Sequence, residues 1–175
     1  EKDWNSYPIF HVDFNSTNYT KSGDALSKLI KGTVEDWERQ YGYVGNEEFD
    51  YGKRFAELLK HVHATTGKRC VVLVDEYDKP LLDVLDSGMV EQGGDGKEML
   101  LEDINREILK GFYSAFKSAD QDLRFVLLTG VTKFSQVSVF SGFNQPADIS
   151  MSTVYDAICG ITEEELEAVF HDEMD

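Results

Sequence analysis

The chain has 175 residues, which suits one domain, and 41% of them are hydrophobic, which is enough to build a core. Against 17 Lys and Arg residues stand 33 Asp and Glu residues, a formal charge of −16. That balance disfavours a broad nucleic-acid footprint, which depends on clustered basic side chains. We find no signal peptide and no apolar run of membrane-spanning length, so we expect a protein of the reducing cytoplasm.

The first half of the chain predicts a strand followed by two amphipathic helices. Residues 7–15, YPIFHVDFN, have the composition of a strand. Residues 22–41 and 51–66 carry apolar side chains at three- and four-residue spacing, which is typical of helices packed on a core. Asp50 is placed to cap the second of these helices, and Gly67 is placed to end it.

The second half predicts two buried strands with helices between them. Residues 69–77, RCVVLVDEY, form a continuous apolar run, as expected for a strand covered on both faces. A short helix from Pro80 to about Asp86, a Gly-rich loop over 87–98 and a long helix over about 98–119 follow. Residues 124–131, RFVLLTGV, predict the next strand.

The remaining residues predict an irregular segment, a short strand and a last helix. Residues 132–150 are rich in Ser, Gly and Asn, and residues 154–161 have the composition of a short strand. Thr162 and Glu165 have the spacing of a capping box, which predicts that the last helix starts there. Strands that alternate with helices indicate an α/β fold with a parallel sheet.

Metal-binding patterns are absent from the sequence. Cys70 and Cys159 lie far apart in apolar stretches, so we expect both to be free and packed. His61 and His63 are two positions apart on a predicted helix. Residues at that spacing do not share a helix face, so we expect no metal pair there.

Polar side chains follow three of the predicted strands. Asp13 follows IFHV, Asp75 and Glu76 follow VVLV, and Thr129 follows FVLL. Ligands of open parallel sheets bind beyond the carboxyl ends of the strands. If these strands are parallel neighbours, the sequence predicts that the four side chains converge on one edge.

Four apolar residues followed by two acids suit a nucleotide hydrolase. The first acid, Asp75, would bind Mg²⁺, which bridges phosphate oxygens, and Glu76 would polarise the attacking water. Thr129 on an adjacent strand would sense the terminal phosphate. A structural interpretation stands beside this one, because strand-end acids often cap the following helix and Asp78 precedes Pro80. The second polar strand end, at Thr129, favours the functional interpretation.

No phosphate-binding loop is encoded in the 175 residues. The signature GxxxxGK[ST] does not occur, and the Gly-rich stretch 92–98 lacks the Ser or Thr that ligates Mg²⁺. Lys133 follows the Thr129 strand and would either reach a phosphate or remain a solvated loop lysine. The loop 134–143 holds Phe134, Phe140 and Phe143, which would fill the core or bind a partner.

Three segments resemble the predicted AAA-ATPase-like family of bacterial P-loop proteins. They are VVLVDEYDKPLLD (71–83), FVLLTGVTKFSQVSVFSGFNQPADIS (125–150) and ICGITEEEL (158–166). The resemblance implies that Asp75 and Glu76 are the acidic pair of the ATPase motif, the Walker B motif, and that Thr129 is the sensor. It implies Mg²⁺ and ATP as cofactors, to which Glu76, Asp75, Thr129 and Lys133 would contribute, with Asp75 on the metal. Members often carry a nuclease-like domain of the PD-(D/E)XK type downstream.

The resemblance also implies a fold and a place within it. The expected fold is the three-layer parallel sheet of P-loop NTPases, incomplete because the first strand and its phosphate loop would lie upstream of YPIFHVDFN. We expect one partial domain over residues 1–175, with a lid-like part beginning at about residue 154. The chain would then be the central fragment of an ATPase and would bind ATP weakly or not at all by itself.

A missing first strand would leave one edge of RFVLLTGV unpaired. A long apolar edge promotes aggregation unless it is covered. We therefore expect a homo-oligomer, a partner chain over this edge, or a rearranged edge closed by the last short strand. A non-catalytic interaction module that uses the aromatic loop 134–143 is the alternative function.

Overall fold

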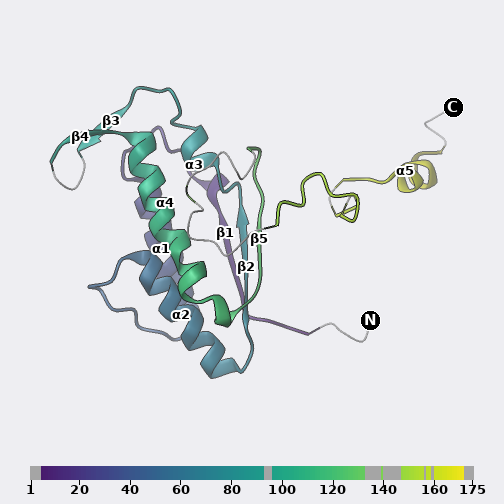
Figure 1. Cartoon of the computed structure of the whole chain (residues 1–175), viewed down its shortest axis with the longest axis horizontal. Helices are drawn as coiled ribbons and strands as arrows, with labels where there is room; N and C mark the ends of the chain where they lie inside the picture. The colour runs from purple at the N-terminus through teal and green to yellow at the C-terminus, as the bar shows by residue number, and fades with distance from the viewer. Residues whose placement is uncertain are drawn as a thin grey trace. The chain divides into compact units, whose positions relative to one another are not determined.

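The structure of the chain is a computed structural model, which describes residues 5–92, 96–132, 139, 147–155, 157–158 and 160–171. It divides into two compact units, residues 1–144 and 145–175. The elements of the first unit are β1 (Ile9–Asp13), η1 (Phe14–Ser16), α1 (Ala25–Gln40), α2 (Tyr51–Thr66), β2 (Cys70–Asp75), α3 (Lys79–Leu82), β3 (Val90–Gln92), β4 (Glu98–Leu100), α4 (Leu101–Ser118), η2 (Asp120–Asp122) and β5 (Leu123–Leu128). The second unit contains α5 (Glu163–Phe170) (Figure 1).

The main sheet has three parallel strands in the order β1-β2-β5. In its register Phe10 is opposite Val72, and Val72 is opposite Val126. Each crossover between neighbouring strands passes through helices, as parallel pairing requires. The predicted parallel α/β fold is therefore confirmed, and in the described residues it is an incomplete one, because β5 pairs with β2 alone.

Helices α1, α2 and α4 lie side by side on one face of this sheet (Figure 1). Alternate strand residues point into that layer and are buried, among them Phe10, Val12, Val72 and Val74. The aromatic rings meet at the centre of the layer, where Phe55 stacks on Phe112 with 5.4 Å between ring centroids. Such pairs contribute about 0.5–1.5 kcal/mol each beyond their buried area.

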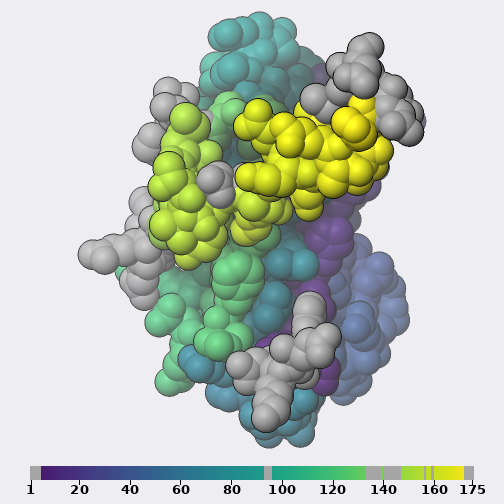
Figure 2. All heavy atoms as spheres, turned by 90° about the vertical axis from the view of Figure 1, so that its right-hand side faces the viewer, coloured from purple at the N-terminus to yellow at the C-terminus, as the bar shows by residue number. Residues whose placement is uncertain are grey.

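On the opposite face of the sheet, some strand side chains are left exposed by the described residues. Ile9 and Phe125 lie on it, on either side of Val71 in the register, and remain 51% and 52% exposed. Figure 2 shows atoms of β1, β2 and β5 reaching the surface side by side on this side of the molecule. The apolar run of residues 69–77 predicted a strand covered on both faces. In the structure, Val71 and Leu73 of β2 are only half-buried.

The predicted helix ends are confirmed. The Asp50 carboxylate accepts a hydrogen bond from the Lys53 amide at 2.9 Å. Gly67 follows α2 with φ of 67°, a left-handed conformation that glycine adopts without a side-chain clash. In the second unit Thr162 and Glu165 form both bonds of a capping box at the start of α5.

Three expectations about local structure are wrong. Residues 87–98 are not simply a loop, because β3 and β4 pair there as an antiparallel hairpin. The short helix α3 ends at Leu82 rather than near Asp86, whereas the long helix predicted over about 98–119 is found as α4, from Leu101 to Ser118. The described residues of 154–161 are turns and bends and contain no strand.

The expected closing of the sheet edge by the last short strand is likewise not found in the described residues, where β5 keeps one unpaired side. Within the described part of the chain, no helix is long and apolar enough to cross a membrane.

Candidate functional site

The carboxyl ends of β1, β2 and β5 meet at one edge of the sheet, as predicted. Asp13 and Asp75 are direct register partners on neighbouring strands. Neighbouring strands lie about 4.8 Å apart, so the two carboxylates start from adjacent positions. Asp13 also accepts a hydrogen bond from the Asn15 amide at 2.7 Å, which fixes its side chain at the start of η1.

Thr129 lies next to Asp75 at this edge. Its hydroxyl donates a hydrogen bond to Asp75 Oδ1 across the ends of β5 and β2. Its amide donates to the carbonyl of Val74 at 2.9 Å, which extends the strand pairing to this residue. The structure thus brings together two of the predicted site residues that are 54 positions apart in the sequence.

Glu76 leaves β2 in an unusual backbone conformation. Its φ is 54°, in the left-handed region that costs a non-glycine residue roughly 1–2 kcal/mol. Two bonds hold the turn, one from the Tyr77 amide to the Thr129 carbonyl at 2.9 Å and one from the Lys79 amide to the Glu76 carbonyl at 3.1 Å. Strain of this kind is concentrated at functional sites, where surrounding contacts maintain it.

Asp78 does not cap the following helix with its side chain. It occupies the N-cap position of α3, but its carboxylate makes no capping bond there. The side chain is fully buried and accepts hydrogen bonds from residues 131 and 132 instead. The cap interpretation of this acid is therefore wrong.

An open polar hollow of about 490 Å³ lies beside η1 and α3, on the same edge of the sheet. It is lined by Asn15, Ser16, Thr17, Asn18, Thr20, Lys79 and Asp83. Lys79 forms an ion pair with Asp83 at 3.0 Å within this lining. Sequence reasoning did not place Lys79 near the strand ends, although the polar run NSTN after β1 was a signal that the edge is hydrophilic.

Lys133 and the aromatic residues Phe134, Phe140 and Phe143 lie outside the described residues. Their predicted roles stay predictions. Val139 is described and is 2% exposed, so one position of the 134–143 loop contributes to the core.

The oxygen atoms at this edge suit a magnesium ion. Mg²⁺ keeps several waters and takes one or two carboxylates together with substrate phosphates. Asp75 is exposed and lies beside Asp13 and the Thr129 hydroxyl, which is a donor set of that kind. The described residues hold no group of three or more His, Cys, Asp or Glu side chains arranged to bind a metal by themselves.

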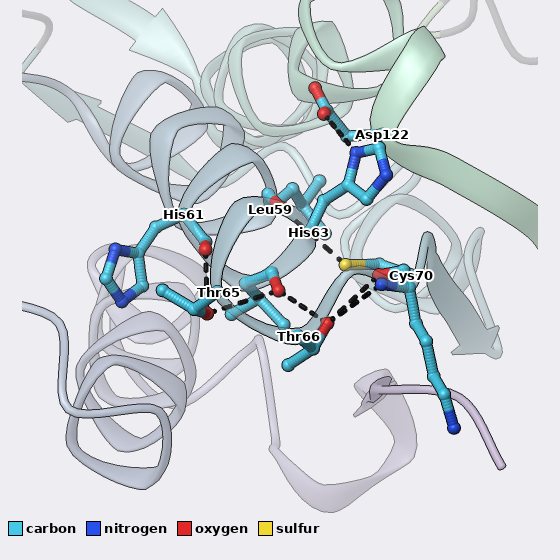
Figure 3. Close-up of polar contacts among 9 residues, drawn as sticks. Leu59, His61, His63, Thr65, Thr66, Cys70 and Asp122 are labelled. Carbon is cyan, nitrogen blue, oxygen red and sulfur yellow. Dashed lines mark hydrogen bonds and ion pairs between the residues drawn. The ribbon is translucent and has the colours of Figure 1, made fainter.

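A second cluster of polar side chains lies away from the carboxyl-end edge, around the end of α2 and the start of β2 (Figure 3). His63 Nδ1 is 2.8 Å from Asp122 Oδ1, whereas the His61 ring packs beside Tyr43. The two histidine rings point away from each other in Figure 3, which confirms the expectation that they do not face one another. Burial raises the pKa of the nearby Cys70 thiol to about 12, which favours the protonated thiol over the reactive thiolate.

A family model described as "Predicted AAA-ATPase" matches residues 1–140. The chain belongs to this family of predicted AAA-ATPases. The match covers every strand described in the first unit and the carboxyl-end edge, including Asp13, Asp75, Glu76 and Thr129.

A curated relative of the chain is described as an uncharacterised protein in the vnfD 5′ region of Azotobacter chroococcum mcd 1. It is 46% identical over 176 residues, which cover 98% of this chain and 31% of the relative. The chain thus spans about a third of the length of this relative. No solved structure matches the chain.

Proposed function

We propose that the chain forms the metal-and-water edge of a Mg-ATP-hydrolysing protein. In this proposal Asp75 holds the metal ion, Glu76 orients and polarises the attacking water, and Thr129 senses the terminal phosphate. The hydrogen bond between Thr129 and Asp75 carries the proposal, because it joins two polar strand ends at the edge where open parallel sheets bind ligands.

The chemistry of each residue follows from its place. A bound Mg²⁺ would neutralise charge on the phosphate oxygens. Asp75 is the exposed last residue of β2, so its Oδ2 atom can face such an ion. Glu76 is the next residue, and its left-handed turn directs its side chain differently from the strand alternation. Thr129 can exchange its bond with Asp75 for a bond to a phosphate oxygen.

The phosphate-binding loop would come from outside the 175 residues. Support comes from the absence of its signature in the sequence and from the relative, which is about three times as long as the matched region. Lys133 would add a positive charge near the phosphates. The preference for ATP rests on the family, and the cytoplasmic location and the lid-like role of residues from about 154 onward belong to the same proposal.

Calorimetric titration with Mg-ATP tests the proposal on the longest protein that the coding sequence encodes and on the 175-residue chain. We expect the long form to bind, and Glu76→Gln to keep binding while losing hydrolysis. Asp75→Ala should weaken Mg-ATP binding. A long form that binds no Mg-ATP would contradict the proposal, and tight binding by the 175-residue chain would contradict an external phosphate loop.

A partner surface is a second candidate function, favoured by the open side of the sheet. Ile9 and Phe125 are about half exposed there, and β5 has one side unpaired in the described residues. A second copy or another chain would cover this surface, and the aromatic loop 134–143 would contribute to it. Sedimentation analysis distinguishes the cases, since a monomer at all concentrations with no bound chain contradicts this candidate.

A further inference from the structure

The carboxylate of Asp78 is fully buried and is bonded to the segment that follows β5. Its Oδ2 atom accepts hydrogen bonds from the Val131 amide at 3.1 Å, the Thr132 amide at 2.6 Å and the Thr132 hydroxyl at 2.5 Å. Asp78 is three residues past Asp75, and these partners come two and three residues after Thr129. One side chain therefore ties the segment after β2 to the segment after β5.

The other oxygen of Asp78 lies where the two segments approach each other closely. Asp78 Oδ1 has no hydrogen-bond partner among the described residues and is buried. A Cβ atom at Gly130 would lie 2.6 Å from Oδ1 and 2.7 Å from Cε1 of Tyr77, so only glycine fits this position. Burying a carboxylate oxygen without a hydrogen-bond partner lowers the free energy of unfolding. A contribution to stability alone therefore does not explain why Asp78 is buried here.

Further bonds continue this connection to the strand ends. The Tyr77 hydroxyl donates to the Thr132 carbonyl, and the Tyr77 amide donates to the Thr129 carbonyl. The Thr129 hydroxyl in turn donates to Asp75. Residues 75–78 and 129–132 therefore form one bonded unit, which we call the strand-end clamp, with the side chain of Asp78 at its buried end.

We propose that Asp78 is a positioning residue of the site: through residues 130–132 it holds the Thr129 hydroxyl against Asp75. This inference rests on the proposed function for its kinetic consequence. Asp78 is fully buried, so it acts through Thr129 and does not touch the nucleotide. An incorrectly placed Thr129 would contact the phosphate poorly in the transition state, which lowers kcat more than it changes KM.

Asp122 supplies a matched control. It is also a buried aspartate, 7% exposed, with one oxygen bonded to His63 and the other without a partner in the described residues. It precedes β5, whereas the clamp follows that strand. Asp78→Asn and Asp122→Asn therefore make the same chemical change at opposite ends of β5.

The kinetic test measures ATP hydrolysis by the longest encoded protein. We expect Asp78→Asn to lower kcat by about tenfold or more with KM within about twofold, and Asp122→Asn to leave both within about twofold. In a Thr129→Val background, Asp78→Asn should cost less than about a further twofold, because both changes remove the same contact. If the two substitutions instead lower kcat by independent factors that multiply in the double variant, the inference is overturned.

A second measurement separates this inference from the proposed function. Amide hydrogen exchange of the nucleotide-free protein, resolved to single residues, should show faster exchange at Thr129 and Tyr77 in Asp78→Asn, with β2 amides unchanged. Gly130→Ala, which displaces Asp78 without removing it, should have the same effect. If the wild-type protein does not hydrolyse ATP, the proposed function fails. The hydrogen-exchange result alone then tests whether Asp78 positions Thr129. Unchanged exchange at Thr129 in both variants would overturn the positioning role.

Discussion

Thr129 donates its hydroxyl hydrogen bond to Asp75 across two strand ends that are 54 residues apart in the sequence. Because Asp13 is the register partner of Asp75 on the other side, polar groups of three strands meet at one edge. A threonine hydroxyl is both donor and acceptor, so this bond can be exchanged for one to an incoming phosphate oxygen. This arrangement is what we would expect if the edge binds Mg-ATP, as we propose.

Removing the Thr129 hydroxyl should impair hydrolysis while the fold persists. For Thr129→Val we expect kcat to fall by about tenfold or more, which corresponds to ~1.4 kcal/mol of transition-state stabilisation. The free energy of unfolding should fall by only about 1 kcal/mol, since the lost hydrogen bond is exposed. Steady-state hydrolysis and urea unfolding of the longest encoded protein measure the two effects. Thr129→Ser keeps the hydroxyl and should retain activity; equal losses in both variants would contradict the role.

The left-handed backbone of Glu76 predicts that the free energy of unfolding depends on which amide side chain replaces it. Asparagine tolerates the left-handed region better than glutamine does, and both replace the carboxylate by an amide. We therefore expect Glu76→Asn to be more stable than Glu76→Gln by about 0.5–1 kcal/mol in urea unfolding, while neither hydrolyses ATP. Equal stability of the two variants would show that the left-handed conformation at residue 76 carries no strain.

The convergence of Asp13, Asp75 and Thr129 could be predicted from the sequence for a physical reason. Apolar runs that alternate with helices give parallel strands, and parallel strands end at the same edge, so a polar residue after each run marks that edge. Asp50, Gly67 and Thr162 were equally predictable, because helix caps depend on residues within one turn of each other.

The connection from Asp78 to Thr132 could not be predicted in this way. Its partners are 53 and 54 residues away, and no local spacing encodes a tertiary contact. Local rules offered a helix cap as the structural interpretation of Asp78, whereas its side chain bonds to residues 131 and 132 instead. The hairpin of β3 and β4 was missed for a related reason, since all six of its residues are exposed and show no alternation of buried positions.

Two glycines on packed helices predict opposite effects of the same substitution. A Cβ atom on Gly52 would lie 2.0 Å from the backbone oxygen of Gly111, so α2 and α4 would have to separate. We expect Gly52→Ala to lower the free energy of unfolding by about 1–3 kcal/mol, as overpacking does. A Cβ atom on Gly111 itself meets nothing within 4 Å.

Gly111→Ala is therefore the matched control. It should raise the free energy of unfolding by roughly 0.5–1 kcal/mol, because alanine favours the helix interior. Thermal or urea unfolding of both variants measures the difference. A Gly52→Ala protein as stable as the wild type would contradict the close contact between the two helices.

The buried thiol of Cys70 predicts a loss of stability at alkaline pH. Burial raises its pKa from 9.0 to about 12 in the folded chain. Between these values the unfolded chain has lost the thiol proton and the folded chain keeps it, so the free energy of unfolding falls as the pH rises from about 9 to about 12. Below pH 9 both states hold the proton, and this contribution is constant. Urea unfolding at a series of pH values measures the slope.

Cys70→Ala should make the free energy of unfolding depend less steeply on pH in this range. The dependence that remains includes the contribution of tyrosines whose pKa is also raised by burial, such as Tyr41 and Tyr43. The same burial predicts slow labelling of Cys70 by thiol reagents in the native state, because the thiolate is the reactive form and the side chain is 0% exposed. A Cys159→Ser background isolates the Cys70 reaction. Labelling of the native chain as fast as that of the urea-unfolded chain, measured at pH 8, would mean that Cys70 is accessible.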